Sequence, residues 1–261
     1  YGHGHGITCL AVNHAGTLMA SACKAREAQS AVVRLWETAT WRGAGLLPGH
    51  QSTVVQLAFS HDDSRLVSVS RDRQVCLFAR QGGEEEGGFR LVKAYAKAHK
   101  RIIWSCSWSH DDALLATGSR DGTVKLWRTV TATTGTSTQQ LLEETTSFEP
   151  LTTSGEGGGG SAVTAVAFLP RAPTFSADVY VLAVGLECGE VELWAGGSGK
   201  EPWRPLGKLL AYPAHAATVR RLRWRPRQVR AEEGGVGDAW PAELASCSAD
   251  HAVRITVVDG V

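Results

Sequence analysis

A short phrase recurs with errors five times along this chain of 261 residues, and the repetition constrains the fold more than any other feature. The clearest copy runs from Ala98 to Trp127 and reads AHKRIIWSCSWSHDDALLATGSRDGTVKLW. A small residue and a histidine open it, an apolar stretch follows, and a Ser-Arg-Asp-Gly turn leads into a run that ends in Leu-Trp. Repetition at a period of about 45 residues is typical of solenoids, propellers and arrays.

Within each copy the pattern predicts short β-strands. Residues 54–59 (VVQLAF) and 163–168 (VTAVAF) are β-prone runs, and polar turns such as SHDDS at 60–64 separate them from the next run. A fourth run precedes the next histidine, at 89–95, 139–143 and 206–211. Four antiparallel strands per repeat are typical of a propeller blade. The sequence therefore predicts an all-β propeller with five visible blades.

We place the repeats at about 4–48, 49–97, 98–145, 160–212 and 214–259, as one partial propeller domain. The last repeat ends on its third strand. Three polar insertions interrupt the pattern, at 81–88, 129–161 and 226–241, and the Gly-rich part near 150–161 is expected to be flexible. An open stack would leave exposed sheet edges, so we expect a larger closed ring.

Composition excludes several classes of protein. The 27 basic and 26 acidic residues nearly cancel, and no apolar run approaches the ~20 residues of a membrane-spanning helix. The six cysteines lack a C-x-x-C spacing and lie mostly in apolar runs, which indicates buried thiols in a reducing compartment. The histidines at 3, 5 and 14 lack ligand spacing with a partner, so we expect neither a metal site nor a cofactor.

The Gly-His and Leu-Trp signatures resemble the WD40-repeat family, whose rings commonly have seven blades. In that family a His, a Ser or Thr, an Asp and a Trp can form a hydrogen-bonded tetrad, and the matching residues here are His99, Thr117, Asp121 and Trp127. Other copies are incomplete. The second has His50, Ser68 and Asp72 but Phe78 in place of Trp, and the fifth has His215, Ser246 and Asp250 but Thr256 in place of Trp. The first has His5, Ser21 and Trp36 with an inserted KAREAQS at the Asp turn, and the fourth has Cys188 at the Asp position. A set that recurs in register is structural rather than catalytic, so we predict that the chain is not an enzyme.

Two stretches are more particular. One is residues 18–41, with SACKA in place of the Asp turn, and the other is SRDRQVCLF with the following HKRIIWSCSW. Together they resemble the C-terminal propeller of the second-subunit family of the Elongator complex. The resemblance implies a non-catalytic scaffold that holds the largest subunit and the radical-SAM/acetyltransferase subunit for tRNA wobble-uridine modification. It also implies a location in the cytoplasm and nucleus. A WD40 adaptor of another complex is the alternative within the same fold.

Candidate contact residues come from the turns of the repeats. Arg71 and Arg120 precede the repeat Asp, and Lys100, Arg101 and Trp104 lie at the start of the third copy. Arg and Trp are enriched at interface hot spots, although solvated arginines or a tryptophan packed between blades would give the same pattern. A basic run adds Arg220, Arg221, Arg223 and Arg225. Strand alternation places the last three opposite Leu222 and Trp224, either as a solvated face or as an RNA or acidic-surface contact.

Overall fold

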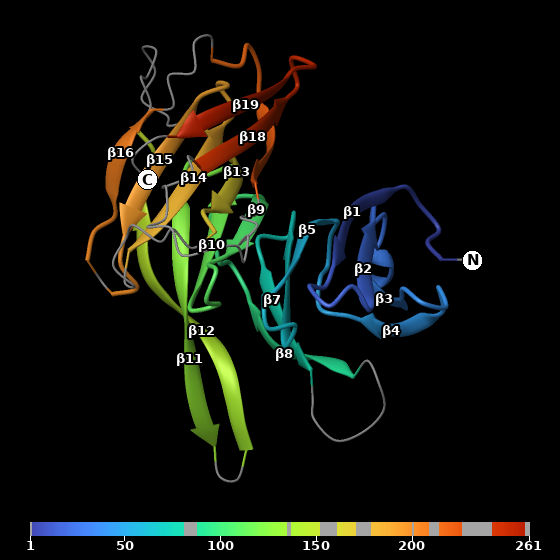
Figure 1. Cartoon of the computed structure of the whole chain (residues 1–261). Helices are drawn as coiled ribbons and strands as arrows, with labels where there is room; N and C mark the ends of the chain where they lie inside the picture. The colour runs from blue at the N-terminus through green and yellow to red at the C-terminus, as the bar shows by residue number, and fades with distance from the viewer. Residues whose placement is uncertain are drawn as a thin grey trace, which may run out of the picture.

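Five antiparallel sheets make up the computed structural model, which describes residues 2–80, 88–134, 137–151, 161–170, 179–199, 201–208, 214–225 and 242–258. The sheets follow one another in chain order from the N-terminal to the C-terminal end (Figure 1). The prediction of an all-β propeller with five visible blades is confirmed. No helix in the described ranges is long and apolar enough to cross a membrane.

Within the described ranges, four sheets have four strands each and the fifth has three. The first contains β1 (Ile7–Val12), β2 (Leu18–Cys23), β3 (Val33–Glu37) and β4 (Gly43–Leu47), with a short 3-10 helix η1 (Ala28–Ser30). The second contains β5 (Val54–Phe59), β6 (Arg65–Ser70), β7 (Val75–Arg80) and β8 (Phe89–Tyr95). The third contains β9 (Ile103–Trp108), β10 (Leu114–Ser119), β11 (Val124–Thr134) and β12 (Ser137–Phe148). The fourth contains β13 (Val163–Phe168), β14 (Tyr180–Leu186), β15 (Val191–Gly196) and β16 (Arg204–Lys208), and the fifth β17 (Val219–Trp224), β18 (Ala242–Ser248) and β19 (Val253–Val258).

The first strand of each sheet is the innermost strand of the propeller. β1 packs beside β5, β5 beside β9, β9 beside β13, and β13 beside β17, whereas the outer strands β4, β8, β12 and β16 have fewer neighbours. Because strand direction alternates, the turns between second and third strands lie at the same end as the loops between sheets. We call this end the upper rim and the opposite end the lower rim.

The core is a series of seams between adjacent sheets rather than one central cluster. Apolar side chains of neighbouring sheets form four clusters, which join the first sheet to the second and so on to the fifth. Interior second strands such as β6, β10 and β14 are buried at every position, since a neighbour covers each of their two faces. The terminal strands β1 and β19 are instead mostly exposed or half-buried, with one buried residue each, Cys9 and Val258.

The outer strands differ partly from expectation. The run predicted at 89–95 is β8 itself. The run predicted at 139–143 is instead β12, a strand of 12 residues that pairs with the 11 residues of β11 and projects from the body as a long hairpin (Figure 1). The Thr-rich composition looked like a loop, but threonine is β-branched and fits an extended strand well. The fourth sheet's outer strand is β16 rather than 206–211. The insertions at 81–87, 152–160 and 226–241 lie outside the described residues.

Candidate interaction surface

The third sheet carries the complete set of four tetrad residues, and hydrogen bonds join them. Trp127 Nε1 donates to Thr117 Oγ1 at 2.9 Å, and Thr117 Oγ1 lies 2.9 Å from His99 Nε2. On the other side of the ring, His99 Nδ1 lies 3.2 Å from an Asp121 oxygen. Every partner is satisfied when His99 carries its proton on Nδ1 and accepts the threonine hydroxyl proton on Nε2. The chain of hydrogen bonds links the loop before β9 to β10, to the turn between β10 and β11, and to β11.

Asp121 also organises the turn around it. It accepts the backbone N–H of Lys100 at 2.8 Å and both the N–H and the hydroxyl of Thr123 at 3.1 Å and 2.6 Å. Burial acts to raise the pKa of Asp121, but the hydrogen bonds from His99 and Thr123 outweigh it and hold that pKa well below its usual value. The carboxylate is therefore ionised and fully engaged within the protein.

The second and fifth sheets repeat three of the four positions. His50 lies 2.7 Å from Ser68 Oγ and 3.0 Å from Asp72. In the fifth sheet the corresponding distances are 2.8 Å from His215 to Ser246 and 3.0 Å from His215 to Asp250. Phe78 and Thr256 stand where the third sheet has its indole, as the sequence predicts.

In the first sheet the assignment of His5 is wrong. His3, not His5, lies 2.7 Å from Ser21 Oγ, which also accepts Trp36 Nε1 at 2.7 Å. The histidine and its hydroxyl partner are 18 residues apart in the first, second and third sheets. The sequence offers two Gly-His pairs at this point, and this spacing would have chosen the earlier one.

The fourth sheet replaces the tetrad with a residue that sequence reasoning missed. Val184 of β14 occupies the position that Thr117 has on β10, because Val184 pairs with Glu192 of β15 as Thr117 pairs with Lys125 of β11. That strand carries Glu192, which is 1% exposed and accepts Trp194 Nε1 at 3.0 Å and the N–H of Leu151 at 2.9 Å. A buried carboxylate thus takes over the role of the hydroxyl.

The candidate contact residues of the second and third sheets lie on the upper rim. Arg71, Lys100, Arg101 and Arg120 are exposed, and Trp104 is half-buried, so it lies partly in a seam. Backbone bonds fix the two turns equivalently, from Arg71 N to Thr53 O at 3.1 Å and from Arg120 N to Ile102 O at 2.9 Å.

Further cations that the sequence analysis did not single out extend this surface. Lys24, Arg26, Arg73 and Lys97 are exposed on turns and loops of the same rim. None of these eight cations makes an ion pair with another described residue, whereas Asp72 and Asp121 of the same turns bond to histidines. Glu27 is exposed beside Arg26. We call the eight residues the basic rim, and its unpaired positive charge suits an acidic partner surface.

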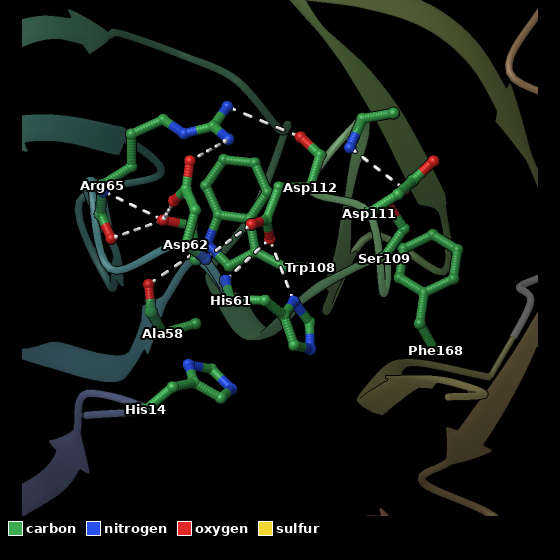
Figure 2. A network of polar contacts seen from close by, with 12 residues as sticks. His14, Ala58, His61, Asp62, Arg65, Trp108, Ser109, Asp111, Asp112 and Phe168 are labelled. Carbon is green, nitrogen blue, oxygen red and sulfur yellow. Dashed lines mark hydrogen bonds and ion pairs between the residues drawn. The ribbon is translucent and has the colours of Figure 1, made fainter. Parts of the chain in front are cut away.

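On the lower rim, the turns between the first two strands of the second and third sheets each bind the turn of the preceding sheet. Asp112 accepts the N–H groups of His61 and Asp62 at 2.8 Å and 2.9 Å and lies 2.9 Å from His61 Nδ1 (Figure 2). The hydrogen bond to Asp112 is the main reason that the pKa of His61 is raised. In the same way Asp63 accepts the N–H groups of His14 and Ala15 at 2.7 Å and 2.8 Å.

Arg65 adds a buried tether beside this contact. Its guanidinium lies 4.9 Å from the ring centre of Trp108 (Figure 2). It also donates to Thr129 Oγ1 at 2.9 Å. Trp108 Nε1 in turn donates to the carbonyl of Ala58 at 3.2 Å. These contacts join the second sheet to the third, so the lower-rim network is structural.

The basic run lies on the innermost strand of the fifth sheet. Leu222 and Trp224 of β17 are buried in the seam with the fourth sheet, and Arg221, Arg223 and Arg225 are exposed on the opposite face, as alternation predicts. Arg225 pairs with Glu243 at 2.9 Å. Burial raises the pKa of the Cys9 thiol on β1 to about 11, and the hydrogen bond from Thr8 and the charge of Arg221 oppose that rise.

No cluster of three or more His, Cys, Asp or Glu side chains suited to a metal ion occurs in the part of the chain that the structure describes. All six cysteines are free thiols, and four are buried. The histidine-centred sets recur at one register in several sheets and are packed into the seams, an arrangement that stabilises sheets.

The WD-domain, G-beta repeat model matches residues 1–37, 43–78 and 90–128, the first three repeats. Elongator complex protein 2 of Dictyostelium discoideum is 35% identical over 98% of this chain and 27% of its own length. The human protein of that name is 35% identical over 98% of this chain and 31% of its own length. The Drosophila melanogaster protein is 38% identical over 98% of this chain and 29% of its own length. The chain thus spans about three-tenths of these relatives. It belongs to the WD40-repeat family and, across nearly its whole length, is a homologue of part of Elongator complex protein 2.

Proposed function

We propose that this chain is the propeller part of a non-catalytic Elongator subunit that holds the largest and the radical-SAM/acetyltransferase subunits together for tRNA wobble-uridine modification. The observation that carries the proposal is similarity over 98% of the chain to proteins named Elongator complex protein 2. The structural use of each His–Asp pair supports a scaffold rather than an enzyme. A location in cytoplasm and nucleus is part of the same proposal.

The basic rim is the surface that we propose for partner contact. Arg71, Lys100 and Arg120 are exposed on a rigid rim, and the nearby carboxylates are engaged internally. An acidic partner would therefore meet unpaired cations whose positions the turns already fix, which favours fast and specific association. Trp104 contributes through its exposed part.

Affinity purification of the full-length protein tests the assignment. Recovery of a large scaffold partner together with an acetyltransferase supports it, and recovery of neither refutes it; a different stable complex would identify an adaptor of another assembly. The triple variant Arg71→Glu, Lys100→Glu, Arg120→Glu should lower recovery of the partners without changing the melting temperature. Arg90→Glu is the matched control, because Arg90 is an exposed arginine on the outer strand β8, away from the basic rim.

A further inference from the structure

One tryptophan of the first sheet stands on an exposed turn. Trp41 lies between β3 and β4 and is 64% exposed. Among the residues that the structure describes, its ring stacks on no other ring, and its indole N–H donates to no acceptor. The indole N–H groups of five other tryptophans donate within the fold, namely those of Trp36, Trp108, Trp127, Trp194 and Trp224. Trp41 is therefore not used for packing as they are.

The backbone of Trp41 makes its identity unusual. Its φ is 56°, in the left-handed region, where the Cβ atom of an L-residue is crowded and glycine is favoured. In the described ranges the other non-glycine residues with positive φ are all polar, namely Asp63, Arg73, Lys97, Asp112 and His251. A glycine here would relieve the strain and remove exposed apolar surface. The described fold thus gives no reason for an indole at this position.

The turn that carries Trp41 is held by hydrogen bonds at both ends. The N–H of Trp41 donates to the carbonyl of Glu37 at 2.8 Å, and the N–H of Glu37 donates to the carbonyl of Arg42 at 2.9 Å. The N–H of Thr38 donates to the carbonyl of Thr17 at 3.0 Å and so fastens this turn to the one between β1 and β2. The indole is carried on a fixed backbone, which lowers the entropy that binding must remove.

The surface around Trp41 suits a protein partner. Ala39 beside it and Ala15 and Gly16 on the fastened turn are exposed, small and uncharged, so they leave room for a partner to approach. Arg42 is exposed and makes no ion pair with any described residue. A tryptophan flanked by an arginine matches the residue types of interface hot spots. A nucleic acid would need a groove with more positive charge than one arginine supplies.

The Trp41 turn and the basic rim lie at opposite ends of the sheets. Turns between third and fourth strands lie on the lower rim, whereas the eight cations of the basic rim lie on the upper rim. The two surfaces also differ in chemistry, since one offers unpaired charge and the other an apolar ring. Surfaces that differ in this way select different partners.

We infer that the Trp41 turn forms a second contact surface, on the lower rim, for a partner protein with an apolar pocket that takes the indole and a carboxylate at its edge that pairs with Arg42. The inference rests on the proposed function, because it assigns the basic rim and the Trp41 turn to different subunits of one complex. A subunit that holds two others together needs two such surfaces.

The variant Trp41→Gly of the full-length protein tests this contact. Glycine suits the backbone of this turn, so the melting temperature should not fall, whereas recovery of one partner should fall at least about tenfold. His251→Gly is the matched control and should leave recovery unchanged, because His251 is also exposed at positive φ but lies on an upper-rim turn. Loss of a partner that the basic-rim triple variant retains supports the inference. Unchanged recovery, loss of the same partner only, or a lower melting temperature would overturn it.

Photo-cross-linking separates this inference from the proposed function. With Trp41→p-benzoyl-phenylalanine in the full-length protein, irradiation of the purified complex should link position 41 to another protein, identified by mass spectrometry, and the same replacement of His251 should not. A link to a protein of an assembly other than Elongator would refute the proposed function and keep the inference. No link, a link to RNA, or a link to a second copy of this chain would overturn the inference.

Discussion

Replacement of Asp121 by alanine is the sharpest test of the tetrad in the third sheet. The carboxylate accepts four hydrogen bonds, from His99, from the N–H of Lys100 and from the N–H and hydroxyl of Thr123. Its removal leaves the buried His99 Nδ1 with Thr123 Oγ1, 3.1 Å away, as its remaining partner among the described residues, and the His99 side chain is 0% exposed. Lys100 is exposed, so water can replace that bond.

The magnitude follows from these partners. Hydrogen bonds to a charged acceptor contribute about 1.5–3 kcal/mol, and His99 keeps its contact to the Thr123 hydroxyl, so we expect a total loss of roughly 2–3 kcal/mol in the free energy of unfolding. Because the folded-state pKa of Asp121 is depressed, its contribution is fully present above the unfolded pKa of about 3.9 and disappears as pH falls through the folded value. The variant should therefore lose less stability than the parent on acidification.

Urea unfolding of both proteins at pH 7 and at about pH 2.5, below the unfolded pKa, measures the two effects. Glu149→Ala is the control, since Glu149 is exposed and its removal should change stability by less than about 0.5 kcal/mol. A loss for Asp121→Ala that is no larger than the control would refute the reasoning, because it would mean that His99 is satisfied without the carboxylate.

Three further predictions concern neighbouring contacts. Trp127→Phe should cost about 1 kcal/mol, less than Asp121→Ala, because it removes one hydrogen bond to Thr117 and the second sheet functions with Phe78; urea midpoints compare the two. Asp112→Ala should cost roughly 2–3 kcal/mol and raise amide exchange at His61 and Asp62, whose N–H groups lose their acceptor; unchanged exchange would argue against the lower-rim contact. His61→Gln should destabilise the protein at pH 6 but little at pH 8. The folded-state pKa of His61 is raised, so its charged form contributes stability below the unfolded pKa of about 6.5, and this contribution is lost as pH rises through the folded value. Equal losses at both pH values in thermal unfolding would contradict this.

The strands could be predicted from the sequence because the residues that define each strand, its apolar alternation and its flanking turns, are contiguous in the chain. Alternation and turn residues located β8 at its observed bounds and placed Leu222 and Trp224 on the buried side of β17. The third-sheet tetrad residues were identified because that copy resembles the WD40 pattern at all four positions, and the structure joins them by hydrogen bonds. His3 was missed because two Gly-His pairs compete at the start of the chain, and only the 18-residue spacing to Ser21 separates them.

Other features depend on what lies opposite a residue in space. The basic rim draws Lys24 and Arg26 of the first sheet onto the same end as Arg71 and Arg120, which no local pattern reveals. Glu192 could not be recognised because the sequence gives a carboxylate two residues before a tryptophan no special meaning until the sheet buries it. The length of β12 was missed because threonine-rich runs serve equally well as loops and as strands.

The fourth sheet shows how little of the repeat signature a blade needs. It lacks the hydroxyl and aspartate positions of the tetrad, yet its second strand β14 is buried at every residue and its seams to both neighbours are complete. Trp194 keeps a hydrogen-bond acceptor because Glu192 supplies one from its own strand. Packing between sheets therefore requires alternating apolar residues and a hydrogen-bond acceptor for the indole N–H. Any acceptor side chain that can reach the indole meets the second requirement.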